Sequence, residues 1–406
     1  MSSSRLTATT LAFGAILVGA LPWALASCAT TDGGGGSSDR DPTKVPEAGS
    51  VDGGDAGATT DGGCDPSDPN CVTKPVGCDE AAFCPSPTNL STALTLTAVW
   101  GSSKNDVWAS GSGGTVLHWD GATWVSTPVP TETTLPIKNT FHALWGSGPN
   151  DVWLASATDV IFHSDGFKNG TVTWVRAPNA TGSEYAKAPI YAAWGTSADD
   201  FRFGGAPCTL ELPGTLTQGN QLVKKPSNAG FEWSRVEGFG TINGIWGSSP
   251  DDIWIVADNS SSTGWQFGQT LHGTRSGSTD FVWADVDSRA SATLLGIWGS
   301  SASDVWTVGE AGAIRHLGSS GDDWSVVDSP TRETLHAVWG TGPKNVWAVG
   351  NSGTILHWDG TAWSPLVAAF PVNKKKPHLY GVWGTGSADV WIVGDGIVLH
   401  STGGGQ

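Results

Sequence analysis

The sequence predicts an all-β protein folded as a seven-bladed β-propeller, with four antiparallel strands in each blade. Three observations support this prediction: a segment that recurs seven times, a two-residue periodicity inside each copy, and a composition rich in glycine and tryptophan. The 406 residues include 56 Gly and 23 Trp but only one Met. Such usage disfavours long helices and suits short strands joined by tight turns.

The recurring segment has the form "AVWGSSKNDVW", as at residues 98–108, and its first tryptophan marks each copy. Successive copies begin 41 to 52 residues apart. A period of this length is typical of solenoids and propellers. The seven marking tryptophans are Trp100, Trp145, Trp194, Trp246, Trp298, Trp339 and Trp383.

Each copy contains four short segments in which apolar and polar residues alternate. In the first copy they are "LTLTAVW", "DVWASG", "TVLHWDG" and "TWVSTP". Alternation of this kind predicts half-buried strands, and turn-forming sequences such as "GSSKND" and "SGG" separate them. Four antiparallel strands of this length make one propeller blade.

Small residues flank the marking tryptophan. The residue two positions before it is Ala or Gly in every copy, and the residue after it is always Gly. The innermost strands of a propeller converge on its axis, where bulky side chains do not fit. The glycine requires either a positive φ or a very close approach of neighbouring atoms.

The seventh copy ends with "IVGDGIVLHSTGGGQ" and contains only three predicted strands. We expect residues 80–85, "EAAFCP", to supply the missing fourth strand and close the ring. Phe83 precedes Trp100 by 17 residues, within the range of spacings that separate other fourth-strand aromatics from the next marking tryptophan. Closure of this kind hides two sheet edges. The predicted propeller therefore spans residues 80–406.

Residues 1–27 have the features of a secretory signal: Arg5, an apolar run at 11–21 and small residues after it. The run is too short to span a bilayer comfortably. The sequence "LASC" at 25–28 resembles a bacterial lipoprotein box, which implies lipidation of Cys28 and an exported protein anchored to the cell envelope, in the outer membrane. The alternative is ordinary cleavage after Ala26, which leaves Cys28 as a plain thiol.

Two segments separate this signal from the propeller. Residues 28–63 are rich in Gly and Asp with almost nothing apolar, so we expect a disordered, flexible tether. Residues 64–79 form a cysteine-rich segment. Its cysteines and the one that follows it are expected to make two disulfides, with three pairings possible, while a zinc site is the alternative. They are Cys64, Cys71, Cys78 and Cys84. The remaining Cys208 is predicted to be a buried free thiol.

The repeat units resemble the Trp-rich propeller repeats of secreted and lipid-anchored proteins from myxobacteria. The units that carry the resemblance combine "AVWGTGPKNVW" with the turn "DGTAW" at 359–363. That turn and "DGATW" at 120–124 are also similar to the Asp-box of sialidase-like propellers, although shorter. The resemblance implies the propeller architecture and says little about activity.

Three repeated residue types are predicted to be structural. Six histidines share one position on the third strand of separate blades, so no three of them can meet one metal ion. An Asp or Asn two residues before the second tryptophan position is expected to accept from the N–H groups of its turn. Most tryptophans occupy fixed positions and are expected to pack between blades. The six histidines are His118, His163, His272, His316, His357 and His400.

Departures from the repeat mark candidate functional residues, since binding residues concentrate in variable loops. Five irregular segments stand out, and most of them connect strands that end on one face. The candidates for partner binding on that face are Trp265 and the lysines of "NKKKP", Lys374, Lys375 and Lys376. Lys224 and Lys225 lie in another irregular segment. Arg202 replaces the second tryptophan in "DDFRFGG", which we interpret as compensation for a local insertion.

The sequence favours a non-enzymatic binding or scaffolding module that engages a protein or a glycan. The alternative is a glycan-processing hydrolase of sialidase-like type. Its arginine cluster, tyrosine nucleophile and acid are not apparent, since the three tyrosines are scattered at Tyr185, Tyr191 and Tyr380. We predict no catalytic residues, metal or cofactor, and we expect a monomer that meets the membrane only through its lipid. A net charge of -17 argues against a nucleic-acid surface.

Overall fold

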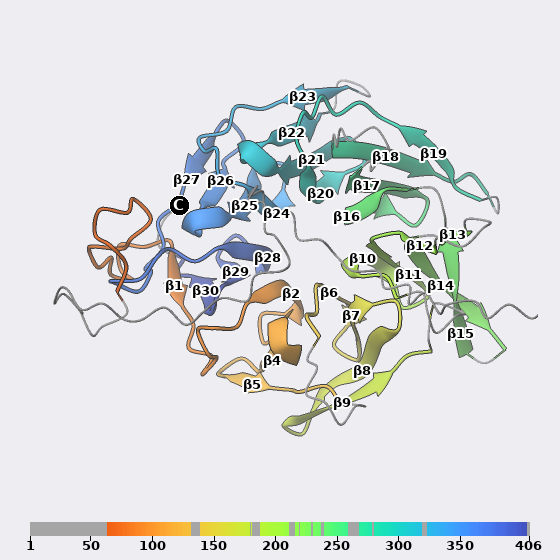
Figure 1. Ribbon diagram of the computed structural model, residues 1–406, viewed down its shortest axis with the longest axis horizontal. Coiled ribbons are helices and arrows are strands. Elements are labelled where there is room, and N and C mark those ends of the chain that lie inside the picture. Colours follow the sequence, from red (N-terminus) through yellow and green to blue (C-terminus); the bar gives the residue numbers. More distant parts are fainter. Residues whose placement is uncertain are drawn as a thin grey trace, which may run out of the picture.

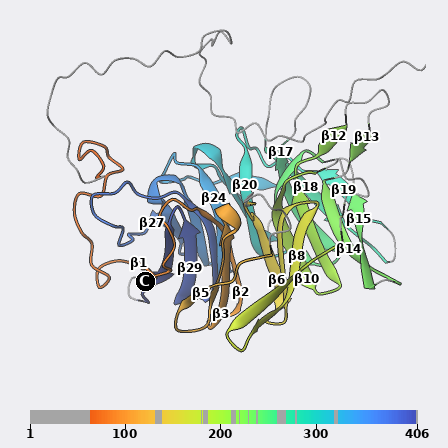
Figure 2. The ribbon, with the colours of Figure 1, turned by 60° about the horizontal axis from the view of Figure 1, so that its bottom comes forward.

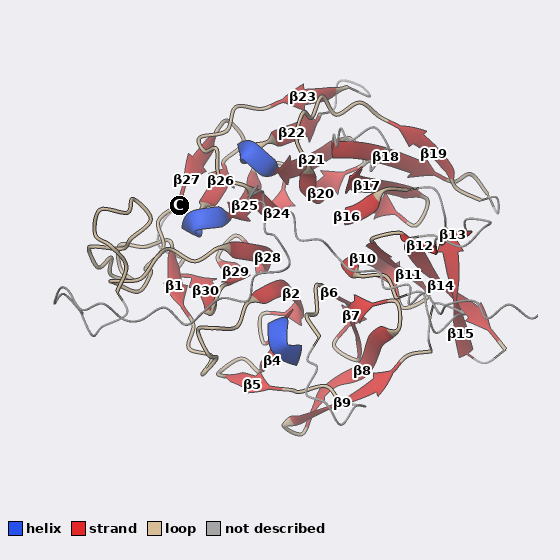
Figure 3. Ribbon diagram, in the orientation of Figure 1, coloured by secondary structure: helices blue, strands red, loops and turns tan. Residues whose placement is uncertain are grey.

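The computed structural model describes residues 63–130, 139–178, 180, 187–210, 216–218, 220–228, 230–236, 239–258, 268–277, 280–318 and 323–403. These residues form seven four-stranded antiparallel sheets, which surround a central axis as a closed ring (Figure 1). The described part is almost entirely strand, with three single-turn 3-10 helices (Figure 3). The predicted seven-bladed propeller is confirmed.

The strands of each blade run outward from the axis in chain order. Blade 1 consists of β2 (Leu96–Ser103), β3 (Asp106–Gly111), β4 (Val116–Trp119) and β5 (Trp124–Ser126), and blade 2 of β6 (Ala143–Gly148), β7 (Asp151–Ala157), β8 (Val160–Lys168) and β9 (Thr171–Arg176). Blade 3 consists of β10 (Ile190–Ser197), β11 (Asp200–Gly205), β14 (Gln221–Ser227) and β15 (Gly230–Val236), and blade 4 of β16 (Thr241–Ser249), β17 (Asp252–Asp258), β18 (Gly268–Thr274) and β19 (Val282–Asp285).

The remaining blades follow the same order. Blade 5 consists of β20 (Leu294–Ser301), β21 (Asp304–Gly309), β22 (Ile314–Leu317) and β23 (Trp324–Val326), and blade 6 of β24 (Leu335–Gly342), β25 (Asn345–Gly350), β26 (Ile355–Trp358) and β27 (Trp363–Pro365). The single-turn helices η1 (Ser112–Gly114), η2 (Glu310–Gly312) and η3 (Asn351–Gly353) join second to third strands. A separate hairpin, β12 (Cys208–Leu210) and β13 (Leu216–Gln218), projects from one end of blade 3 (Figure 2).

Blade 7 joins the two ends of the described chain. It contains β28 (Leu379–Gly386), β29 (Asp389–Gly394) and β30 (Ile397–Ser401), and the N-terminal strand β1 (Phe83–Pro85) pairs antiparallel with β30 as its fourth strand (Figure 1). Phe83 lies opposite Ser401 and is buried in a core cluster that also contains Trp347 of blade 6. The predicted closure of the ring by residues near 80–85 is confirmed.

A close approach between neighbouring blades explains the glycine after each marking tryptophan. A Cβ atom on Gly101 would lie 2.6 Å from Cη2 of Trp383, in the preceding blade, and 2.5 Å from the carbonyl oxygen of Asp106. The same juxtaposition recurs around the ring, and none of these glycines has a positive φ. Of the two alternatives, close approach is therefore correct. The other pairs are Trp100–Gly146, Trp145–Gly195, Trp194–Gly247, Trp246–Gly299, Trp298–Gly340 and Trp339–Gly384.

A second set of aromatic contacts joins the blades farther from the axis. The second tryptophan of a blade meets the tryptophan on the fourth strand of the next blade edge-on. Ring centroids lie 5.3 to 5.8 Å apart at interplanar angles of 78° to 87°, which is the favoured T-shaped geometry. The pairs are Trp108–Trp174, Trp153–Trp233, Trp254–Trp324, Trp306–Trp363 and Trp391–Trp124. Most tryptophans thus hold blades together, as predicted.

The cysteine-rich segment is stapled by two disulfides, Cys64–Cys71 and Cys78–Cys84. The structure thus supports the disulfide interpretation over the zinc alternative and selects the sequential pairing. Cys84 belongs to β1, so the second disulfide reinforces the strand that closes the ring. The predicted free thiol of Cys208 falls on β12, whose side chains lie outside the described residues. The signal at 1–27 and most of the tether at 28–63 also lie outside them.

Candidate functional site

Asp, Trp and His side chains form one arrangement that recurs in most blades. The Asp opens the second strand, the Trp follows two residues later on the same face, and the His lies directly opposite that Trp on the third strand, as Trp108 lies opposite His118. His Nε2 lies 2.5 to 2.9 Å from the Asp Oδ1 in five blades. The predicted role of these histidines in hydrogen bonding inside the blade is confirmed.

The histidine ring also packs against the tryptophan in this arrangement, which we call the Trp–His–Asp triad. Ring centroids lie 3.9 to 4.7 Å apart in six blades. Blade 6 has Asn345 in place of the carboxylate, and the distance from His357 Nε2 to its Oδ1 lengthens to 3.3 Å. A charged acceptor makes the shorter bond.

The triad carboxylates bind side chains rather than the N–H groups of their turns, so that part of the prediction is wrong. A Ser or Thr hydroxyl four residues earlier donates to the second oxygen, as Ser147 donates to Asp151 at 2.6 Å. Burial alone would raise the pKa of Asp151, but hydrogen bonds from His163, Ser147 and Trp153 lower that pKa to about 2. The carboxylate is thus held in its charged form as a structural acceptor.

Blade 3 lacks the triad. Arg202 occupies the tryptophan position on β11, and Val223 occupies the histidine position opposite it on β14. Asp200 is retained and accepts a hydrogen bond of 2.9 Å from Nη2 of Arg202. Arg202 is 2% exposed, and its guanidinium lies 5.2 Å from the ring centroid of Phe281 in blade 4. Two aromatic rings are thereby replaced by one slender cation and one small apolar side chain.

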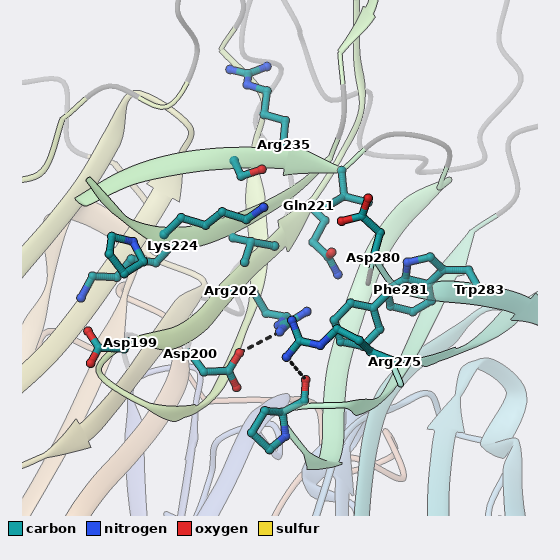
Figure 4. A pocket seen from close by; sticks show the side chains of 16 residues that line it. Asp199, Asp200, Arg202, Gln221, Lys224, Arg235, Arg275, Asp280, Phe281 and Trp283 are labelled. Atoms are coloured by element: carbon teal, nitrogen blue, oxygen red, sulfur yellow. Dashed lines mark hydrogen bonds and ion pairs between the residues drawn. The ribbon is translucent and has the colours of Figure 1, made fainter. Parts of the chain in front are cut away.

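A groove opens between blades 3 and 4 where these rings are missing (Figure 4). Its volume is about 660 Å³, which is in the range of small-ligand sites. Trp283 of blade 4 lines the groove from the fourth-strand position that, in other interfaces, meets the second tryptophan of the preceding blade. It packs instead against Phe239 and Phe281, with ring centroids 5.0 and 5.6 Å away.

The groove is locally basic in an acidic protein. Five basic residues line it against three acidic ones: Arg202, Lys224, Lys225, Arg235 and Arg275 against Asp199, Asp200 and Asp280. Burial, opposed in part by Asp200, lowers the pKa of Arg202, and the nearby positive charge of Arg275 lowers this pKa further. Two guanidinium groups therefore approach each other in the groove.

Neighbouring groups position the other cations of the groove. Lys224 Nζ donates to the carbonyl oxygen of Ala198 at 2.7 Å, and Arg275 Nε donates to Asp251 at 2.6 Å. Figure 4 shows the guanidinium groups of Arg202 and Arg275 next to each other, beside the ring of Phe281, and the Arg275 guanidinium lies 5.0 Å from that ring. Packing on the aromatic ring keeps both guanidiniums in place.

The predicted lysine site lies elsewhere, at the seam of the ring. Lys374, Lys375 and Lys376 line a second pocket of about 780 Å³ beside β1 and the β29–β30 turn. Their backbone is bonded to the cysteine-rich segment, with Val72 N donating to Lys374 O at 3.0 Å, and Lys375 pairs with Asp68 at 2.7 Å. The three lysines thus join the cysteine-rich segment to the ring. Trp265, the other predicted binding residue, lies outside the described residues.

The groove and the lysine pocket involve opposite ends of the blades. Asp199 and Pro250 at the groove belong to turns between first and second strands, whereas Ser352 and Gly396 at the lysine pocket belong to turns between second and third strands. Sequence reasoning noted Arg202, Lys224 and Lys225 separately and did not bring them together. The signal that could have found the groove is that the third copy alone lacks both the Trp and the His.

Within the described ranges, no three His, Cys, Asp or Glu side chains are grouped so as to hold a metal ion. Neither Tyr191 nor Tyr380 lines the groove, and Tyr185 lies outside the described residues. No helix in the described part of the chain is long and apolar enough to cross a membrane.

Comparisons with known proteins show the fold alone. No protein-family model and no curated protein matches the sequence. The structure resembles YCF48 bound to D1 peptide, with a TM-score of 0.56 and 16% identity over 83% of this chain and 99% of that one. It also resembles YCF48 from Cyanidioschyzon merolae (0.56, 18% identity, 79% and 99% covered) and the WD40 repeats of RRP9 (0.57, 8% identity, 81% and 99% covered).

Proposed function

We propose that this protein is an exported, lipid-anchored propeller that binds a partner protein and catalyses no reaction. The observation that carries the proposal is the groove between blades 3 and 4, because it is the place where the Trp–His–Asp triad gives way to Arg202 and Val223. In a repeated scaffold, one interface between blades can carry binding residues while the other interfaces stabilise the ring.

The structural neighbours support a binding role. One of them is described as bound to a peptide, and others are WD40 repeat domains. Because their identity to this chain is low, these neighbours do not indicate which partner it binds. The chemistry of the partner has to be inferred from the residues that line the groove. A groove of about 660 Å³ can receive a few residues of an extended segment.

The groove does not favour the hydrolase alternative. Three arginines line it, Arg202, Arg235 and Arg275, but the two described tyrosines are absent from its lining. Asp200 is hydrogen-bonded to both Arg202 and Thr196, so its oxygens serve structural donors. The arrangement is suited to holding a ligand, and the described residues that line the groove include no nucleophile hydrogen-bonded to a base.

Site-specific photo-crosslinking in the native envelope tests the binding role. A benzoylphenylalanine at Asp280, an exposed residue on the rim of the groove, is expected to capture a discrete partner. The matched control is the same substitution at Asp323, which is exposed beside the fourth strand of blade 5. Equal capture from both positions, or none from Asp280, would contradict the proposal.

The lipid anchor is tested separately through Cys28. The Cys28→Ser variant should move from the membrane fraction to the soluble fraction, because it loses the thiol that the lipoprotein box offers for lipidation. The Cys208→Ser variant is the control and should remain with membranes. If the Cys28→Ser variant still fractionates with membranes, the anchor is not at this residue.

A further inference from the structure

We propose that the groove between blades 3 and 4 binds a carboxylate group of an acidic peptide segment. The inference rests on the proposed binding function and names the chemistry of its ligand. The groups involved are Arg202 and Gln221 on blade 3, with Arg275, Phe281 and Trp283 on blade 4.

Two buried hydrogen-bond donors in the groove have no partner. Nε of Arg202 and Nε2 of Gln221 are buried and have no hydrogen-bond partner, and the two residues, which line the groove, are 2% and 1% exposed. Buried donors in folded proteins are almost always satisfied, so two of them lining one groove indicate a missing acceptor. The acceptor must come from outside the described residues of the blades.

The two donors belong to one face of one sheet. Arg202 lies opposite Val223, and Gln221 lies opposite Gly204, so the two side chains are diagonal neighbours on adjacent strands. Diagonal neighbours of this kind are about 7 to 8 Å apart at their backbones, within reach of long side chains. Gly204 has no side chain, and Ile242 and Ile245 of blade 4 pack over it. Both Arg202 and Gln221 line the groove, and each offers its donor to a bound acceptor.

The charge of the groove selects an anion. The like charges of Arg202 and Arg275 approach each other, and a bound anion would relieve their repulsion. Three aspartates in the lining offset three of the five cations and leave an excess of positive charge, which favours an anion. The Nε edge of a guanidinium also matches the planar oxygens of a carboxylate.

The apolar part of the groove favours a peptide over a free small acid. Phe281, Trp283, Pro226 and Pro250 line the wall beside the cations. Aromatic and proline surfaces of this kind bury the apolar side chains that flank a charged residue. The expected ligand is an extended acidic segment with apolar neighbours, whose carboxylate belongs to a side chain or to the C-terminus.

Fluorescence anisotropy with three labelled hexapeptides tests the assignment on the purified full-length protein. The first peptide alternates Glu and Phe and has an amidated C-terminus. The second has Gln in place of Glu and is also amidated, and the third is the Gln peptide with a free C-terminal carboxylate. At least one carboxylate-bearing peptide should bind tenfold or more tightly than the amidated Gln peptide, and the tighter one identifies the source of the carboxylate. Equal binding of all three overturns the proposal.

Two groove variants and one control complete the test. The double variant Arg202→Trp with Val223→His restores the triad, fills the groove and should weaken binding at least tenfold. Gln221→Met removes one donor at similar size and should weaken binding several-fold even if the double variant fails to fold. Arg315→Gln removes a buried arginine of blade 5, which donates to the carbonyl oxygen of Arg289, and should leave binding unchanged in folded protein.

Competition separates carboxylate from phosphate recognition. At equal ionic strength, acetate should displace the peptide at least as well as inorganic phosphate does. Stronger displacement by phosphate, or wild-type affinity in a folded groove variant, overturns the assignment. These outcomes are distinct from failure of the proposed function. If a partner crosslinks at Asp280, and neither the groove variants nor competing peptides reduce that crosslinking, the binding function is supported and the carboxylate assignment is wrong.

Discussion

The triad carboxylate of Asp151 makes a measurable and pH-dependent contribution to stability. Its pKa is about 2 in the folded protein against an ordinary value of 3.8. Its side chain is 18% exposed, so solvent screens the effect only in part. The difference corresponds to about 2 kcal/mol of folding free energy at neutral pH. Asp151→Asn removes the charge and keeps an oxygen that can accept from His163, as Asn345 does in blade 6.

The sign of the pH dependence follows from the lowered pKa. The stabilisation is fully present above pH 4, where the unfolded chain is also ionised, and it is lost as pH falls toward 2. Urea unfolding followed by tryptophan fluorescence should therefore show a deficit of about 2 kcal/mol for Asp151→Asn at pH 7 and roughly 1 kcal/mol near pH 2.5. The reciprocal variant Asn345→Asp should gain stability at pH 7. A deficit that does not change with pH, or no deficit at pH 7, would refute this account.

Three further predictions follow from the packing. Gly340→Ala should lower the free energy of unfolding by about 1 to 3 kcal/mol, because its Cβ would lie 2.8 Å from Trp298. Gly342→Ala is the control and should change this free energy little, because no atom lies within 4 Å of its Cβ. Equal melting temperatures for the two variants would contradict this prediction. Phe83→Ala should cost about 3 kcal/mol and increase proteolysis before residue 86, and unchanged cleavage would show that β1 is held by other contacts. The double variant Arg202→Trp with Val223→His should raise the melting temperature, because aromatic packing takes the place of a buried guanidinium whose Nε has no hydrogen-bond partner. A lower melting temperature would mean that the groove cannot accommodate the triad.

Much of the fold could be predicted because the information is local and repeated. Strand alternation, turn residues and the small residues beside Trp100 are legible within a single copy. The last copy lacks a fourth strand, and Phe83 precedes Trp100 by a spacing within the range of fourth-strand aromatics. Together these two features predict that the segment around Phe83 supplies the missing strand. Disulfide pairing was not predictable in this way, because three pairings satisfy the same spacing.

The candidate site was less predictable because its residues come from two copies. Arg202 departs visibly from the repeat, but Phe281 and Trp283 line the same groove only because blades 3 and 4 are adjacent. Likewise, "NKKKP" is a basic loop in sequence, and nothing local indicates that its backbone bonds to residues near Cys71, some 300 positions away. Only the three-dimensional structure shows the direction of each side chain and the donors that have no hydrogen-bond partner, such as Gln221 Nε2.

The closing strand also sets an order of events during synthesis. Among the described strands, β1 is synthesised first and its partner β30 last, and Thr402 Oγ1 donates a hydrogen bond to Ala81 O across 321 residues. Blades 1 to 6 are each assembled from neighbouring segments and need only short-range pairing, which forms quickly. Residues 80–85 must therefore remain unpaired until translation reaches the end of β30. A chain interrupted before that point leaves β1 unpaired and leaves uncovered the apolar face of blade 1 that packs against blade 7. Completion of the ring therefore requires that the whole repeat array has been made.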